Sequence, residues 1–298
     1  LMYDAKAAAH EGDAIRCKQN IDAAFSLALH VREHPVLISD LVSLSIVNMT
    51  LTTLSDIFSH EPFLFDAAML EEFKTHLGNM DASLEIRFEG ERYFFLDLLQ
   101  RMYTDDGNGD GSLVPTEAVA KVEMLTSVSS TQATGLLPAF AIPICDIFQA
   151  SRKELLDEYD RRLALIEEFK GNPLFDLKQS GFPLQAAWTN INPITGKYFL
   201  LDLLMPALDR TILQTRYRSG HVSGVIATIY AVEQYQLTGS WPTSLEEAGT
   251  LDEWNGNPFL IVQGETHPVI YSVGADQDDD GGRHHKDART WNSQTDGD

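Results

Sequence analysis

The chain has 298 residues and a formal charge of −22, from 44 acidic against 22 basic side chains. This balance argues against nucleic-acid binding, because neutralising phosphates requires clustered lysine and arginine. Hydrophobic residues make up 44% of the chain, with 15 Phe and 9 Tyr, so the sequence predicts a folded protein and not an acidic disordered tail. The length allows one large domain or two moderate ones.

Helical periodicity dominates the first two thirds of the chain. Apolar residues recur at three- and four-residue steps over residues 21–31, which predicts an amphipathic helix ending near His34 and Pro35. Over residues 37–54 the apolar residues are denser than one stripe requires, so we expect a central, largely buried helix. The many polar side chains within residues 36–58 argue against a membrane span there, and we expect no transmembrane segment.

Three further helices are predicted before residue 170, over residues 66–77, 91–103 and about 138–169. Gly78 is the expected end of the first of them, and Pro143 is expected to kink the last. Residues 171–197 are rich in Asn, Pro and Gly, which indicates an irregular segment and the best candidate for a domain boundary.

The C-terminal part is predicted to combine one long helix with a hairpin. The helix covers residues 208–237, and two short β-branched and aromatic runs, residues 258–262 and 269–273, flank a glycine as hairpin strands do. The predicted fold class is therefore mainly α (α+β), with a helical body over residues 1–200 and a smaller helix-and-hairpin part over residues 201–298. Packing of both parts as one compact unit is the alternative.

An acidic loop between two predicted helices has the composition of a calcium site. The segment 106–117 fits the pattern D-x-[DN]-x-[DN]-G-x5-E at every specified position. Calcium takes six to eight oxygen ligands, which alternate side chains, one backbone carbonyl and a bidentate carboxylate can supply. The candidate ligands are Asp106, Asn108, Asp110, Glu117 and the backbone carbonyl of Ser112.

This loop closely resembles an EF-hand loop, which implies a helix–loop–helix around one calcium ion. Gly111 permits the sharp turn of such loops, and Leu113 stands where that family places an aliphatic residue. Val114 departs from the pattern, because it cannot hold the bridging water that a polar residue holds at the ninth position. The alternative is an Asp- and Gly-rich surface turn that binds no ion.

A second acidic loop covers residues 276–287. Its first six positions satisfy the same pattern, but an aspartate replaces the final glutamate, and strand-like sequence precedes it. Four carboxylates within five residues repel one another unless they are solvated or neutralised by a cation. The adjacent His284 and His285 suggest a transition metal, but the oxygen-rich setting favours calcium. The candidate ligands are Asp276, Asp278 and Asp280.

Motifs in the last third of the chain occur in a definite order. They are Tyr235, Gly239, residues 241–245, residues 254–259, residues 271–276, Gly281 with Gly282, Asp287, and Trp291 with Asn292. This order resembles the globular head of major type II secretion pseudopilins, in which a long helix leads to a small sheet followed by a calcium-binding loop. The resemblance implies that Asp276 and Asp287 are ligands, assisted by backbone oxygens around Ser272.

The rest of the chain departs from the pseudopilin pattern. A pseudopilin begins with a hydrophobic, processed helix, whereas the corresponding helix here carries Arg210, Arg216 and Glu233 and follows an unrelated helical body. The head is therefore expected to be a reused module. Chains with this layout resemble exported or membrane-anchored bacterial proteins, and that resemblance implies no activity.

The N-terminal residues and the two cysteines are the features that bear on the cellular compartment. The sequence already has helical character at Leu1, so an export signal or anchor upstream is our expectation, and a trimmed cytosolic start is the alternative. Cys17 and Cys145 have neither the spacing of a zinc site nor that of a redox motif, and the sequence leaves their pairing open.

No recognisable catalytic motif accompanies the acidic loops. The sequence lacks a G-x-S-x-G elbow, an H-E-x-x-H helix, a phosphate-binding loop and a dinucleotide fingerprint. The leading hypothesis is a non-enzymatic, extracytoplasmic calcium-binding protein with a structural or interaction role, whose partners are calcium and another protein or an envelope component. The alternatives are an envelope-associated hydrolase with its active site in a helical cleft, and a pseudopilin-like component of a secretion apparatus.

Overall fold

The structure, a computed structural model, describes residues 1–83, 85–117, 149–169, 172–179, 197–198, 201, 206–264, 266–274 and 277–283. These residues are mainly helical and include one small antiparallel sheet, as the sequence predicted. The chain forms two compact units. The first contains Leu1–Arg87, Asn172–Ser180 and Leu213–Asp298, and the second contains Phe88–Gly171 and Gly181–Ile212. This division differs from the boundary expected near residue 200, because the N-terminal helices and the C-terminal hairpin belong to the same unit.

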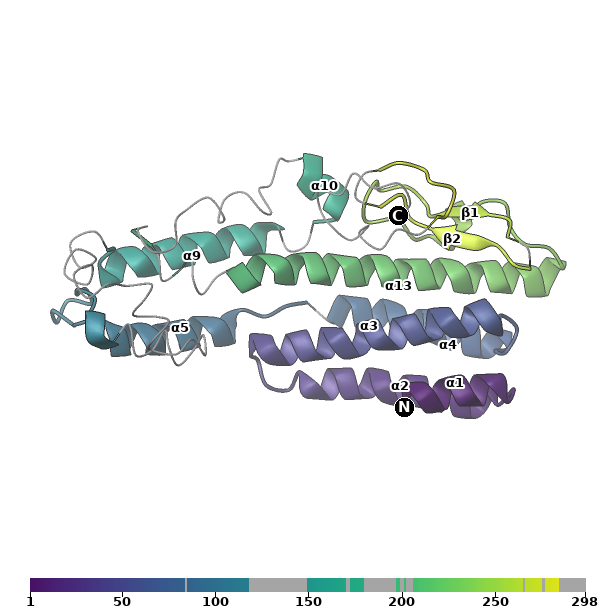
Figure 1. Ribbon diagram of the computed structural model, residues 1–298, viewed down its shortest axis with the longest axis horizontal. Coiled ribbons are helices and arrows are strands. Elements are labelled where there is room, and N and C mark those ends of the chain that lie inside the picture. Colours follow the sequence, from purple (N-terminus) through teal and green to yellow (C-terminus); the bar gives the residue numbers. More distant parts are fainter. Residues whose placement is uncertain are drawn as a thin grey trace. The chain divides into compact units, whose positions relative to one another are not determined.

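The first unit is built on long helices (Figure 1). They are α1 (Met2–His10), α2 (Ala14–Val31), α3 (Leu37–His60), α4 (Ala67–Ser83), the short α10 (Leu174–Gln179) and, from Leu213 onward, α13 (Pro206–Thr238). The predicted helices over residues 21–31 and 37–54 are confirmed and extend further. Gly78 does not end α4 as expected, since the helix continues to Ser83. An isolated glycine is tolerated within a helix, and a side chain at Gly78 would contact nothing. The short helix α10 lies in the segment that was expected to be irregular.

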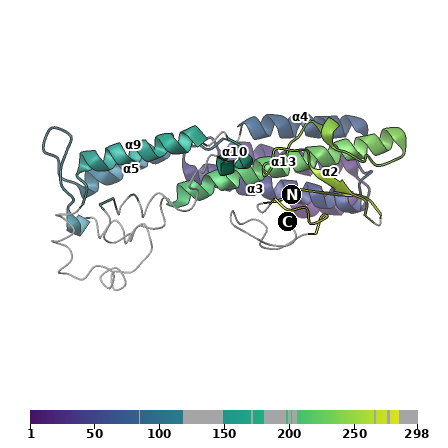
Figure 2. The ribbon, with the colours of Figure 1, turned by 90° about the horizontal axis from the view of Figure 1, so that it is seen from above.

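One apolar core joins α1 to α4 with α13. It contains Phe25, Leu51, Phe73 and Ile229, each fully buried. An ion pair at 2.9 Å between Lys74 of α4 and Glu233 of α13 adds a polar link between these helices, which lie side by side (Figure 2). The shared core explains why helices from both ends of the chain form one unit.

Helix α3 is the most apolar element of this core. By length and composition it is the one helix among the described residues that could cross a membrane, with a mean hydropathy of 1.5 over its most apolar 18 residues, half of them buried. These values fit a core helix and a membrane span alike, whereas the sequence analysis argued against a span. Its buried polar groups include Asp40, Ser43 and Thr50.

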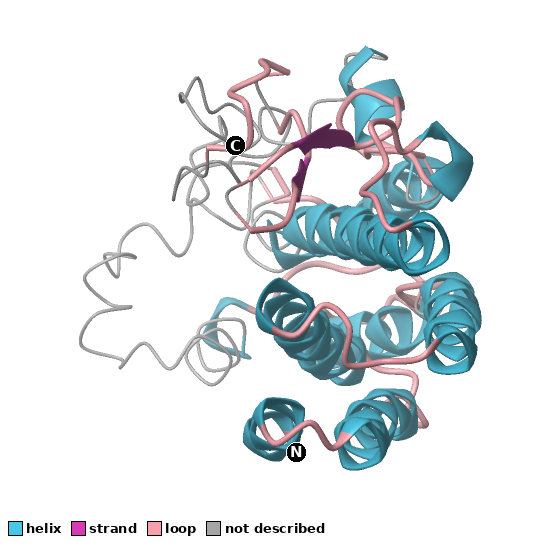
Figure 3. Ribbon diagram, turned by 90° about the vertical axis from the view of Figure 1, so that its right-hand side faces the viewer, coloured by secondary structure: helices cyan, strands magenta, loops and turns pink. Residues whose placement is uncertain are grey.

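The predicted hairpin is present as β1 (Leu260–Val262) and β2 (Val269–Tyr271), paired antiparallel with Ile261 opposite Ile270. A short 3-10 helix, η1 (Glu246–Ala248), precedes it. The hairpin packs through Phe259 and Leu245 onto Ala227 and Ala231 of α13. In Figure 3 the strands lie on the opposite side of the helices from the N-terminus. Helix α13 therefore separates the bundle core from a smaller core under the hairpin.

The second unit contains α5 (Glu89–Met102) and α9 (Arg152–Phe169). The rings of Phe95 and Tyr159 stack with centroids 4.2 Å apart, and Arg92 pairs with Asp160 at 3.0 Å. The predicted helix over residues 91–103 corresponds to α5, and α9 corresponds to the charged end of the predicted segment 138–169. Pro143 and Cys145 lie outside the described residues, whereas Cys17 is buried as a free thiol whose pKa burial raises to about 11.

A buried carboxylate holds the turn between α2 and α3 against the chain that follows α4. Asp40, with 2% of its side chain exposed, pairs with Arg32 at 2.9 Å and with Arg87 at 2.7 Å, and it also accepts the backbone N–H of Arg87. Arg87 in turn donates to the backbone carbonyl of Arg32. Burial raises the pKa of Asp40, but the hydrogen bonds from Arg87 and Arg32 outweigh it and hold that pKa below its ordinary value.

We expect Asp40→Asn to lower the free energy of unfolding by about 3–5 kcal/mol, because it leaves two arginines beside a buried site without a counter-charge. Asp56→Asn is the matched control, since Asp56 forms an exposed pair with Lys6 and its loss should cost less than about 1 kcal/mol. Urea denaturation followed by circular dichroism measures both. Equal effects of the two substitutions would contradict a dominant role for Asp40.

The same contact predicts a pH dependence. Because the pKa of Asp40 is lower in the folded state, its stabilisation is complete above the unfolded pKa of about 3.9 and is lost as the pH falls through the folded value. The wild-type protein should therefore lose more stability below about pH 4 than Asp40→Asn does. Parallel stability curves for the two proteins between neutral and acidic pH would contradict this.

Candidate metal centre

The acidic loop over residues 106–117 connects α5 to a helical turn that begins at Pro115, as predicted. A β-bridge between Tyr103 and Leu113 closes its base. Two backbone hydrogen bonds flank the bridge, from Thr104 to the carbonyl of Ser112 at 2.9 Å and from Val114 to that of Met102 at 2.7 Å. The loop is thus a short closed hairpin, and the Ser112 carbonyl, predicted as a ligand, accepts a backbone hydrogen bond.

Asp106 lies at the centre of this loop. Its Oδ1 accepts the backbone N–H groups of Asn108 at 2.8 Å and Asp110 at 3.1 Å. These hydrogen bonds lower the pKa of the Asp106 carboxyl, so the side chain is a stable anion. The structure therefore brings three of the predicted ligand residues into one turn.

Glycine is required at the position that the calcium-loop pattern specifies. A Cβ atom at Gly111 would lie 1.9 Å from the carbonyl oxygen of Thr104, so no other residue fits without moving the backbone. Gly107 and Gly109 adopt positive φ angles of 81° and 89°, a region that L-residues avoid. The local sequence is thus needed to fold the loop, whether or not an ion binds.

Asp110 has a second role that the sequence did not indicate. Its Oδ1 accepts the backbone N–H groups of Gly111 at 2.8 Å and of Lys153, in the first turn of α9, at 3.0 Å. Arg152 reinforces this contact, since its backbone donates to the carbonyl of Gly111 and its side chain pairs with Asp105 at 3.1 Å. A carboxylate is favourable at a helix N-terminus, so the loop also caps α9.

The predicted ligands do not all converge. Within the described parts of the chain, no group of three or more His, Cys, Asp and Glu side chains is placed to share a metal ion. Glu117 is exposed, and neither Glu117 nor Asp106 forms an ion pair with any described residue, whereas the neighbouring Asp105 and Glu154 pair with Arg152 and Lys197. Among the described residues, these two carboxylates therefore have no counter-charge.

The second acidic loop is described only in part. The predicted ligands Asp276 and Asp287 lie outside the described residues. Asp278 accepts the backbone N–H of Asp279 at 2.9 Å, and Asp280 lies 3.6 Å from Arg283. The Tyr271 hydroxyl donates to Asp279 at 2.8 Å, which ties this loop to β2.

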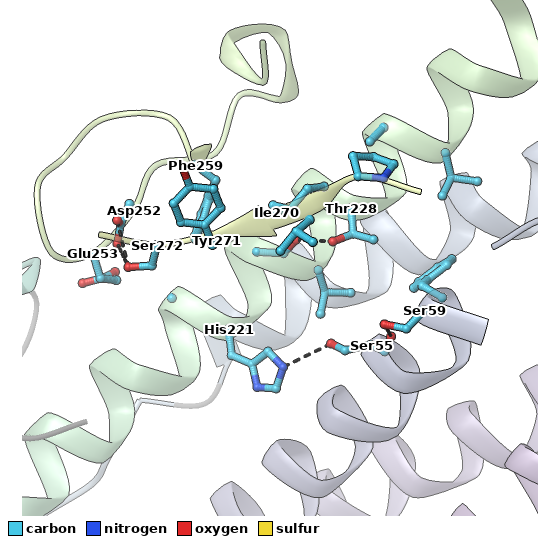
Figure 4. A pocket seen from close by; sticks show the side chains of 18 of the residues that line it. Ser55, Ser59, His221, Thr228, Asp252, Glu253, Phe259, Ile270, Tyr271 and Ser272 are labelled. Carbon is cyan, nitrogen blue, oxygen red and sulfur yellow. Dashed lines mark hydrogen bonds between the residues drawn. The ribbon is translucent and has the colours of Figure 1, made fainter. Parts of the chain in front are cut away.

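Ser272 and Asp252 form a part-buried polar contact in the hairpin region (Figure 4). The Ser272 hydroxyl donates to the carboxylate of Asp252 at 2.9 Å and accepts the backbone N–H of Gly274 at 2.9 Å. The same carboxylate accepts the backbone N–H groups of Trp254 at 3.0 Å and Val273 at 3.1 Å. Asp252, only 3% exposed, therefore holds the chain before β1 against the chain after β2.

The sequence analysis did not find Asp252. Burial raises the pKa of its carboxyl, and the hydrogen bonds from Trp254, Ser272 and Val273 oppose that rise. Its one local signal is position, because it directly precedes a turn in which Gly256 donates to the Asp252 carbonyl and Asp252 donates to the Asn257 carbonyl. The distant partners Ser272 and Val273 leave no local pattern.

Comparison with known proteins adds no relative. No family model matches the chain, and neither the curated proteins nor the solved structures contain a match. The EF-hand and pseudopilin resemblances therefore remain predictions from the sequence.

We expect Asp252→Ala to destabilise the hairpin region by on the order of 3 kcal/mol, because it leaves three buried donors without an acceptor. Thermal unfolding followed by tryptophan fluorescence measures this, since Trp254 is one of the residues held. The control is Glu246→Ala, at an exposed position of η1, which should change stability by less than about 0.5 kcal/mol. If Asp252→Ala unfolded at the same temperature as the wild type, the carboxylate would be dispensable for stability.

Proposed function

We propose that this chain is a non-enzymatic calcium-binding protein in which the loop over residues 106–117 binds the ion and calcium stabilises the second unit. The observation that carries the proposal is that neither Asp106 nor Glu117 pairs with a cationic side chain of the described residues, in a loop that matches the calcium pattern and needs glycine at Gly111. Carboxylates without a counter-charge are suitable ligands for a hard cation.

The donor set suits a hard cation. Side-chain oxygens of Asp106, Asn108, Asp110 and Glu117, with the Ser112 carbonyl, would hold the ion, and all five are oxygen donors as calcium requires. When bound, calcium would supply the positive charge that these carboxylates lack. One oxygen of Asp110 is already occupied by two N–H donors, so that residue would connect the ion to the N-terminus of α9.

The proposed setting is extracytoplasmic, either periplasmic or membrane-anchored. Sites of the weak extracellular class, with Kd on the order of 10⁻⁴ to 10⁻³ M, are loaded only where calcium is abundant. The second loop, with Asp276, Asp278, Asp280 and Asp287, is proposed as a further calcium site. The proposed partner is another protein or an envelope component, with no nucleic acid, since the net charge of −22 would repel phosphates.

An envelope hydrolase is the second candidate, and one observation favours it. Asp252 and Glu253 lie beside the same cavity, and burial raises the pKa of both carboxyls, as catalytic acids require. Each carboxylate, however, accepts backbone N–H groups, Asp252 from Trp254 and Val273 and Glu253 from Leu174. Structural carboxylates make such contacts, so the calcium proposal is preferred. A secretion-apparatus component is the third candidate and rests on the head resemblance alone.

We expect calcium to raise the melting temperature and excess chelator to lower it, because an ion that binds only the folded state stabilises that state. With about 10 mM calcium and a Kd of about 1 mM, the gain should be about 1.4 kcal/mol. Differential scanning calorimetry measures the shift, and isothermal titration calorimetry measures the binding.

Variants show which loop causes the calcium-dependent shift of the melting temperature. Asp106→Asn combined with Glu117→Gln should abolish the calcium shift that this loop causes, whereas Asp97→Asn, at an exposed position of α5, should keep it. Asp276→Asn tests the second loop separately. An unchanged melt in excess chelator, together with no heat of calcium binding, would refute the proposal.

A further inference from the structure

A cavity of about 490 Å³ lies within the first unit, lined by α3, α13, α10 and the hairpin. Figure 4 shows Ser55 and Ser59 of α3 on one side and Phe259, Ile270 and Tyr271 of the hairpin region on the other. Its wall is mostly apolar and aromatic, and includes Phe58, Val225, Trp241 and Trp254. This size and lining are typical of sites for small organic molecules.

One end of the cavity carries a buried donor without an acceptor. The Nε atom of Arg216 is buried and makes no hydrogen bond within the described part of the chain. Its ion pair with Glu253 is loose, with Nη1 3.8 Å from the Oε1 atom of that carboxylate. Arg216 therefore carries charge and hydrogen-bonding capacity that its described neighbours do not fully use.

Glu253 is less available to a ligand than Arg216. Its Oε2 accepts the backbone N–H of Leu174 at 3.2 Å, and its backbone carbonyl accepts that of Phe175 at 2.9 Å, so it holds the start of α10. Burial also raises its pKa, which weakens it as an anchor for a cation. The group here that can still take up a ligand is therefore a hydrogen-bond donor, the guanidinium of Arg216.

A second polar group lies along the wall. The Oγ atom of Ser55, on α3, and the Nε2 atom of His221, on α13, are 3.3 Å apart, so these side chains satisfy each other (Figure 4). The rest of the lining is mostly apolar, although Ser59 and Thr228 also belong to it. The cavity thus combines a mainly apolar wall with one arginine, Arg216, and two acids, Asp252 and Glu253.

We propose that this cavity binds an amphipathic monoanion, a small molecule with an apolar body and a single carboxylate, whose carboxylate pairs with Arg216. The apolar body lies against the aromatic wall, and its burial supplies most of the affinity. This function is separate from the calcium site proposed for residues 106–117, since that loop belongs to the other unit.

The test is titration of the full chain with decanoate, decan-1-ol and decylammonium, each below its aggregation concentration. Trp241 and Trp254 line the cavity, so tryptophan fluorescence reports binding, and calorimetry gives an independent measure. We expect decanoate to bind at least tenfold more tightly than the alcohol or the ammonium. Equal binding of all three, or tighter binding of decylammonium, would overturn the proposal.

Variants assign the carboxylate to Arg216. Arg216→Gln should weaken decanoate binding about tenfold, a loss of about 1.4 kcal/mol, and leave the alcohol unchanged, whereas Arg101→Gln, in an exposed pair with Asp97, should change neither. Glu253→Gln keeps the acceptor for Leu174 and should bind decanoate at least as tightly as wild type. Loss of binding in Glu253→Gln, or wild-type affinity in Arg216→Gln, would overturn the assignment.

A cavity-filling variant gives a test that does not alter charge. Thr228 lines the cavity from α13 with a half-buried side chain. Thr228→Phe should abolish binding of decanoate and of the alcohol together while circular dichroism remains that of wild type. Undiminished binding in this folded variant would place the ligand elsewhere and overturn the proposal.

Discussion

Burial of α13 on two sides is the constraint on which the first unit depends. Val225 and Ile229 pack into the core formed with the N-terminal helices, while Ala227 and Ala231 pack under the hairpin with Phe259. The hairpin has only three residues in each strand, and so small a sheet is not stable alone in water. The hairpin is stable because it packs on an apolar face of α13, and the opposite face of α13 packs into the core of the bundle.

Hydrogen bonds to four acidic side chains, two of them buried, tie the loops of this unit to one another. Asp40 holds the turn after α2, Asp81 accepts hydrogen bonds from Arg218 and Ser219, and Asp252 joins the two ends of the hairpin region. Glu253 anchors the start of α10. From the sequence, roles were predicted for acidic residues of the two candidate calcium loops, whereas these four carboxylates hold the fold together through internal hydrogen bonds. Part of the negative charge is therefore compensated within the protein by arginines and backbone N–H groups.

Regular elements could be predicted because their signals are local. The stripe over residues 21–31, the dense apolar run of α3 and the β-branched runs around the hairpin each specify an element within a few turns or residues of sequence. The partners of Asp40 and Asp252 could not be predicted, because Arg87 and Val273 are brought to them only by the tertiary fold. The helix α10 was missed for the same reason, since it is held from outside by Glu253.

The candidate calcium loop could be predicted from the sequence only in part. Its residue types and spacing are local, and the folded turn around Asp106 agrees with them. The attachment of Asp110 to α9 is not local, because Lys153 lies 43 positions further along the chain. A carboxylate shared between an ion and a helix N-terminus would link occupancy of the loop to the packing of α9 against α5. Calcium would then act on the stability of a helix pair through Asp110, whereas Asp40, Asp81 and Asp252 of the first unit accept hydrogen bonds from arginines, serines and backbone N–H groups.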